Sequence, residues 1–224
     1  SIEYYIFKNN LNEFSSINLA ESGARMSNNL SAFIEYIPKI QNISHIVFLD
    51  GYNEILPLKF SNTVDNDFYW VAGVKDRLQN PEFFLLKKYL DKSFLKTIFF
   101  KKNKNLNAKF YLVKKSYEDY LYRKKIITNL CKIYEVKCIF FFQPTLYTSK
   151  NLSGNRINEI NKFFLNNNFK KNYKFLYKIS KNNSEIIKLD TIFDDKEDIF
   201  LDDVHVDKYG NELIAKEIIK YIKN

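Results

Sequence analysis

The stretch IVFLDG at residues 46–51 decides the fold class. A continuous apolar run that ends in an Asp-Gly pair is typical of a strand buried in a parallel sheet. Two later runs have the same character: Cys138–Phe142, which Gln143-Pro144 closes, and the shorter Ile186–Leu189. A further short strand is expected over residues 16–20. These runs predict a sheet of short, mostly parallel strands.

Helical patterns separate these runs. Leu30, Phe33, Ile34 and Ile37 have the i, i+3, i+4, i+7 spacing of an amphipathic helix, which Pro38 should end. Further helices are expected over residues 2–11, over 82–100, from a capping box at Ser116 and Asp119 to about Tyr134, over 155–166 and after Gly210, with a loop over 166–172. Because strands alternate with helices, the class is α/β with a mostly parallel sheet. No repeat or domain boundary stands out, so residues 1–224 are expected to form a single domain.

The composition excludes several classes of protein. Hydrophobic residues make up 46% of the 224 residues and charged residues 27%, as in ordinary globular proteins, and no stretch reaches the ~18 apolar residues that span a membrane. The net charge is +9, but only four of the 35 basic residues are Arg and the Lys residues are spread over the chain. Nucleic acid is therefore not an expected partner. No Gly-x-Gly-x-x-Gly motif indicates a dinucleotide site.

The cysteines and histidines are few. Cys131 lies in a helical pattern and Cys138 opens an apolar run, so both are expected to be buried free thiols. With His45 and His205 as the only histidines, a Cys/His zinc site is not expected. The first ten residues lack a signal-peptide pattern. Since the chain begins with Ser1 rather than Met, its localisation stays open.

The candidate site lies where the predicted strands end, because ligands gather at the carboxyl ends of strands in open parallel sheets. Asp202 and His205 form an Asp-x-x-His pattern just before the last helix. This spacing lets the carboxylate accept the Nδ1–H of the imidazole, which fixes one tautomer and stabilises the cation, as in a nucleophile-activating triad. Asp203 and Asp207 are the alternatives for the orienting acid, and the pattern also occurs in plain surface loops.

Two glycines follow predicted strands. Gly51 permits a sharp turn, after which the Asn53 side chain can point its amide at a developing oxyanion. Gly23 can expose its backbone N–H to a ligand. An Asx turn at Asn53 and a plain turn at Gly23 are the structural alternatives.

The order of these pieces resembles the SGNH/GDSL hydrolase family. The matching residues are Gly23, Gly51–Glu54 (a Gly-x-Asn-Asp block with Glu in place of Asp), Phe142–Pro144, Asp202 with His205, and Gly210. The resemblance covers about residues 2–224. It implies a three-layer sandwich with a flavodoxin-like sheet that lacks its first strand here, which leaves an unpaired edge beside Ile46–Leu49.

The nucleophile is the one departure from the family pattern. The family's serine belongs to a Gly-Asp-Ser-like block after its first strand, and no such block is present, so we expect the chain to begin after the nucleophile. Ser22 as a relocated nucleophile, or an inactive relative, are the alternatives.

The resemblance implies a serine esterase that acts on O-acyl or O-acetyl carbohydrate or lipid esters. His205 is the general base, Asp202 orients it, and Gly23 and Asn53 form the oxyanion hole; no metal or organic cofactor is implied. Glu54 is expected to support the loop by hydrogen bonding, and His45, at the other end of its strand, to be structural. The alternatives are an O-acyltransferase of the same family and a non-catalytic carbohydrate-binding or surface-polysaccharide assembly module.

Overall fold

The structure, a computed structural model, describes residues 5–6, 8–9, 11, 14–20, 23–60, 109–163 and 167–223. Over these residues it contains one parallel sheet of three strands in the order β1-β2-β3: β1 His45–Asp50, β2 Lys137–Phe142 and β3 Ile186–Lys188. The β1–β2 register runs from His45 beside Lys137 to Asp50 beside Phe142. Three of the four predicted strands and the α/β class are confirmed.

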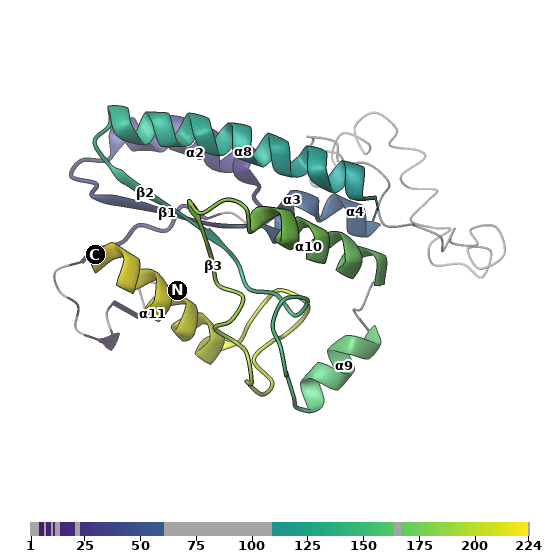
Figure 1. Cartoon of the computed structure of the whole chain (residues 1–224). Helices are drawn as coiled ribbons and strands as arrows, with labels where there is room; N and C mark the ends of the chain where they lie inside the picture. Colours follow the sequence, from purple (N-terminus) through teal and green to yellow (C-terminus); the bar gives the residue numbers. More distant parts are fainter. Residues whose placement is uncertain are drawn as a thin grey trace, which may run out of the picture.

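Helices cover both faces of this sheet (Figure 1). They are α2 Met26–Tyr36, the 3-10 turn η1 Ile37–Lys39, α3 Tyr52–Ile55, α4 Pro57–Phe60, α8 Phe110–Ile133, α9 Asn155–Phe163, α10 Asn167–Ser180 and α11 Lys208–Lys223. Figure 1 shows α2, α8 and α10 on one side of the strands and α11 on the other. As predicted, α2 ends just before Pro38, and η1 takes this proline into its first turn.

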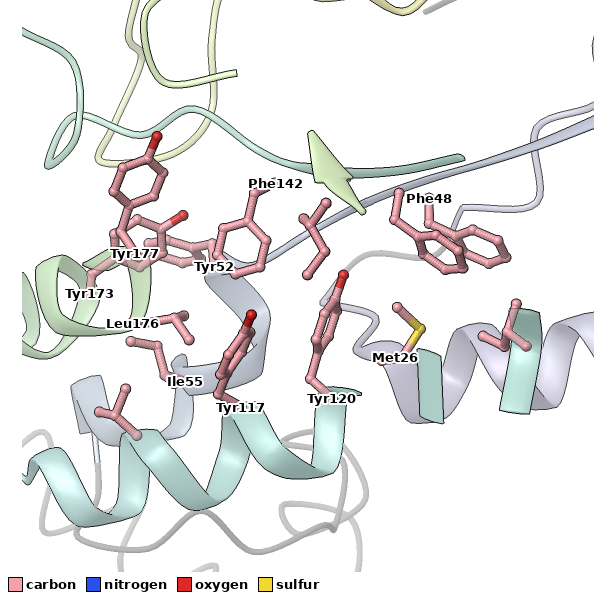
Figure 2. Close-up of a cluster of buried hydrophobic side chains, with 14 of the residues drawn as sticks. Met26, Phe48, Tyr52, Ile55, Tyr117, Tyr120, Phe142, Tyr173, Leu176 and Tyr177 are labelled. Carbon is pink, nitrogen blue, oxygen red and sulfur yellow. The ribbon is translucent and has the colours of Figure 1, made fainter. Parts of the chain in front are cut away.

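Strand β2 supplies side chains to both halves of the core because successive residues of a strand point to opposite faces. Phe140 and Phe142 belong to the large cluster under α2, α8 and α10. Ile139 and Phe141 pack with Ile218 of α11. Figure 2 shows the large cluster, in which Tyr117 and Tyr120 of α8 point toward Phe142. This central position explains why the whole apolar run at β2 is needed.

Strand β1 is less buried than its sequence predicts. Among the described residues it pairs with β2 alone, and Leu49 is 39% exposed. The unpaired edge expected beside Ile46–Leu49 is therefore present in this part of the chain.

Three predictions of local structure are wrong. Residues 16–20 form no strand, since no described strand lies beside them to complete a ladder, and Ile17 is 66% exposed. Helix α8 begins at Phe110, so Ser116 is an interior residue that is buried rather than a cap. Residues 167–172, predicted as a loop, begin α10, because an apolar stripe of Phe169, Tyr173, Leu176 and Tyr177 faces the core. The helix predicted over 82–100 and most of the one over 2–11 lie outside the described residues.

The prediction of free thiols is also wrong, because Cys131 and Cys138 form a disulfide. Helix α8 ends in a Schellman turn: Glu135 has φ +55°, and the N–H of Val136 donates to the Cys131 carbonyl at 3.0 Å. This turn folds β2 back along the helix. The two Cα atoms then lie 6.2 Å apart, within the range that a disulfide bridges.

The disulfide should contribute measurably to stability. Replacing both cysteines by Ala should lower the free energy of unfolding by about 2 kcal/mol, since the bond closes a short loop and so removes only a limited amount of denatured-state entropy. Thermal unfolding with and without dithiothreitol measures this. Dithiothreitol should lower the Tm of the native chain and leave that of the double variant unchanged. Two titratable thiols in the denatured, unreduced protein would contradict the assignment.

Candidate functional site

The site begins at Gly51, where the chain turns at the end of β1. Gly51 has φ +123°, and a Cβ atom built there would lie 2.8 Å from the Phe142 ring. Both the backbone conformation and the lack of space therefore require glycine. The turn leads directly into the short helix α3, whose first three residues reach three different parts of the structure.

Asn53 and Gly23 are brought together. The Nδ2 amide of Asn53 donates to the Ala24 carbonyl at 3.0 Å, so its side chain lies beside the turn that follows Gly23. Gly23 has φ +75°, and a Cβ built on it would meet no atom within 4 Å. The space on the side-chain side of Gly23 is therefore open among the described residues, one residue away from the Asn53 contact at Ala24.

Glu54, the residue after Asn53, connects this segment to the start of α2. Its Oε1 accepts the N–H of Met26, the first residue of α2, at 2.7 Å, and its Oε2 lies 3.7 Å from Nε of Arg25. A carboxylate at a helix N-terminus is favourable because the helix dipole is positive there. Burial raises the pKa of Glu54, while the Arg25 charge and the Met26 N–H oppose that shift. Glu54 is therefore a structural support, as its position in the sequence predicted.

Asp202 and His205 form a hydrogen-bonded pair. Oδ2 of Asp202 lies 2.7 Å from Nδ1 of His205, and Oδ1 accepts the backbone N–H groups of Val204 at 2.8 Å and His205 at 2.7 Å. Partial burial alone would raise the pKa of Asp202, but the N–H groups and the ring of His205 outweigh it and lower the pKa. The carboxylate thus stays ionised beside an imidazole whose side chain is 75% exposed.

The two other acids near His205 have different partners. Asp203 points into the protein, where Oδ2 accepts the Tyr52 hydroxyl at 2.7 Å and the Tyr147 hydroxyl at 2.5 Å. Oδ1 of Asp207 accepts the Gly210 N–H at 2.9 Å in the first turn of α11. The structure therefore selects Asp202 among the three alternatives for the acid that contacts His205.

The contact between Tyr52 and Asp203 places the two halves of the candidate site at the same edge of the sheet. Tyr52 directly follows Gly51 and directly precedes Asn53, while Asp203 lies between Asp202 and His205. His45 opens β1 at the other end of the strand, where Nδ1 lies 3.0 Å from Oγ of Ser44. Ser22, the alternative nucleophile, lies outside the described residues.

The buried polar side chains around these residues are not apparent from the sequence patterns. Asp50 is 6% exposed; Oδ1 accepts the Asn29 amide at 2.7 Å, whereas Oδ2 has no hydrogen-bond partner among the described residues. Burial raises the pKa of Asp50 to about 8, the charge of Glu54 adds to the shift, and Asn29 opposes it. Tyr52 and Asp203 stand at the x positions of the Gly-x-Asn and Asp-x-x-His motifs, so their place in the sequence pointed to the site. No sequence pattern points to Tyr147.

Within the described ranges, no three His, Cys, Asp or Glu side chains gather closely enough to hold a metal ion. The described helices include none whose length and apolar character would let it cross a membrane. Comparisons with protein-family models, with curated proteins and with solved structures find no match.

The buried Asp50 carboxyl should make stability depend on pH. The folded state keeps the Asp50 proton up to about pH 8, whereas the unfolded state loses it near pH 4, so between these values unfolding releases a proton and stability falls as pH rises. Asp50→Asn removes this contribution. The free energy of unfolding of this variant minus that of the native chain should rise by at most about 1.4 kcal/mol per pH unit from pH 4 to 8 and then level off.

Urea unfolding at several pH values measures this difference in free energy of unfolding. Glu118→Gln changes an exposed carboxyl and serves as the control, which should follow the pH dependence of the native chain. An Asp50→Asn curve parallel to the native curve from pH 4 to 8 would contradict the prediction.

The contact between Asp202 and His205 fixes where the neutral imidazole carries its proton. Because Nδ1 faces a carboxylate, the proton of neutral His205 should be on Nδ1. Proton–nitrogen correlation NMR distinguishes the two ring tautomers, and His45 is the only other histidine in the spectrum. Asp202→Asn should shift His205 toward a mixture of tautomers and leave His45 unchanged. A His205 already in the Nε2–H form in the native chain would contradict the contact.

Proposed function

We propose that the chain carries the acid–base and oxyanion-binding parts of a serine esterase of the SGNH/GDSL type, which acts on O-acyl esters of carbohydrates or lipids. The observation that carries the proposal is the 2.7 Å contact of ionised Asp202 with Nδ1 of an exposed imidazole, at the sheet edge that also holds Asn53. The proposal includes the family's three-layer sandwich with a flavodoxin-like sheet, in which β1, β2 and β3 would be three neighbouring strands.

His205 acts as the general base and then as the general acid. Nδ1 donates to Asp202, so Nε2 is the nitrogen that takes the serine proton as the hydroxyl attacks the ester carbonyl. The same nitrogen returns the proton to the leaving alcohol, which leaves an acyl-enzyme for water to hydrolyse. Ionised Asp202 stabilises the imidazolium that forms in both steps.

Asn53 and Gly23 stabilise the oxyanion of the tetrahedral intermediate. The Asn53 amide has two N–H bonds, and its contact with Ala24 uses one, so the other is available for the substrate oxygen. In this proposal the Gly23 backbone N–H is the second donor, and no side chain at this position blocks a substrate, since a Cβ built on Gly23 meets no atom within 4 Å. Loss of one such donor typically reduces kcat about 10²–10³-fold.

The nucleophile in this proposal is a serine from the Gly-Asp-Ser-like block that the family carries ahead of the segment matching Ser1. No described serine contacts the His205 ring in this structure, which is consistent with a nucleophile from elsewhere. A carbohydrate-binding module has no need for a carboxylate that fixes the tautomer of an exposed imidazole. This feature favours the esterase over the binding module.

The test is hydrolysis of p-nitrophenyl acetate by the longer protein, which is the chain together with any sequence encoded ahead of Ser1. His205→Ala should lower kcat at least about 10³-fold, because a triad without its base keeps only binding and oxyanion stabilisation. Asn53→Ala should lower kcat about 10²–10³-fold. His45→Ala is the matched control and should keep full activity, since His45 lies at the other end of β1.

Two results would overturn the proposal: no hydrolysis of any acetyl ester by the longer protein, or hydrolysis that survives His205→Ala. The 224-residue chain alone should hydrolyse the ester slowly or not at all. Rapid hydrolysis by it that Ser22→Ala abolishes would instead identify Ser22 as the nucleophile.

A further inference from the structure

The loop that carries Asp202 and His205 is closed at its base. A bridge pairs Phe200 with Val206, and the Leu201 N–H donates to the His205 carbonyl at 2.8 Å. The bonds that Asp202 makes to Val204 and His205 lie within this loop. These contacts set the shape of the loop, but they do not set its position relative to Asn53.

Asp203 connects this loop to the rest of the site. Asp203 is buried, with 3% of the whole residue exposed, whereas the His205 side chain is 75% exposed and hydrogen-bonds to Asp202 of its own loop. The Tyr52 hydroxyl reaches Asp203 from the turn at the end of β1, and the Tyr147 hydroxyl reaches it from the turn after β2. The Asp203 carbonyl also accepts the Leu146 N–H at 3.1 Å.

We infer that Asp203, held by Tyr52 and Tyr147, is the positioning residue that sets His205 relative to Asn53; the inference rests on the proposed esterase function. Each tyrosine fixes the loop against a different strand end, so the two hydroxyls together define its position. Of the two tyrosines, Tyr52 connects the loop more directly to Asn53, because Asn53 is the next residue along the chain.

The chemistry of the cluster suits a rigid connection. A buried carboxylate is stable only when hydrogen bonds replace its lost water, and two phenol hydroxyls supply charge-assisted bonds. Burial raises the pKa of Tyr52 and of Tyr147, and the Asp203 carboxylate raises both further. Both hydroxyls therefore remain protonated donors throughout the range in which an esterase works.

Ring packing offers a matched control. Tyr52 and Tyr147 both contact the Tyr173 ring, with centroids 6.0 Å and 5.9 Å apart, and the Tyr173 hydroxyl donates to the Gln143 carbonyl rather than to Asp203. Tyr173→Phe thus removes a buried hydroxyl from the same aromatic cluster without touching the loop. Any general effect of loosening the cluster should appear in both variants.

The experiment compares Tyr52→Phe/Tyr147→Phe with Tyr173→Phe in two measurements. In the 224-residue chain, proton–nitrogen NMR follows the His205 ring nitrogens and the exchange rate of the Nδ1 proton with water. The double variant should exchange this proton at least about tenfold faster, while Tyr173→Phe and the His45 signals stay as in the native chain. In the longer protein, the double variant should lower kcat about 10–100-fold with KM nearly unchanged, because only the placement of the base changes.

The outcomes separate the two proposals. Unchanged His205 signals in a double variant that remains folded would overturn the positioning role. Equal effects of the double variant and Tyr173→Phe would overturn it as well, since the role would then be merely structural. Altered His205 signals in the 224-residue double variant, together with no ester hydrolysis by the longer native protein, would keep the positioning role and overturn the esterase. Asp203→Asn, which retains an acceptor oxygen, should restore part of the native exchange rate relative to Asp203→Ala.

Discussion

The turn at Gly51 is the constraint on which the rest of the structure depends. The strand ends against the Phe142 ring of its neighbour, and only a residue without a Cβ can turn there. Because the turn is so tight, the next three side chains leave α3 in different directions. Tyr52 reaches the histidine loop, Asn53 reaches Ala24, and Glu54 reaches the start of α2. One short segment thus organises three pieces of chain that are far apart in sequence.

Buried polar groups make this organisation specific. Glu54 and Asp203 lie in the interior, where a carboxylate without partners is strongly destabilising, so each tolerates only the geometry that supplies its donors. Glu54 accepts the Met26 N–H and forms an ion pair with Arg25, and Asp203 accepts the hydroxyls of two tyrosines. Apolar packing alone would allow the loops to slide over the core. The hydrogen bonds to these two acids determine which residues meet.

The sequence predicted the parts of the fold that depend on neighbouring residues. The apolar runs at β1, β2 and β3, the end of α2 before Pro38 and the contact between Asp202 and His205 are all local, and the structure contains each of them. The errors have long-range causes. Helix α10 is stabilised by a core that its Asn- and Lys-rich start does not reveal, and the disulfide depends on a Schellman turn with Glu rather than Gly at its left-handed position. The contacts of Asp203 span 151 and 56 residues, beyond the reach of any local pattern.

The contrast between Asp202 and Asp203 shows how adjacent residues divide two tasks. The Asp202 carboxylate points toward the exposed imidazole, and the next carboxylate, that of Asp203, points toward the core. In the proposed esterase, a base that takes the proton of the serine nucleophile needs exposure, yet exposure deprives it of packing contacts that would hold it still. In the positioning role inferred above, the buried Asp203 supplies that restraint through the backbone of the same loop. His205 would then be both accessible and fixed, and neither property follows from the Asp-x-x-His spacing alone.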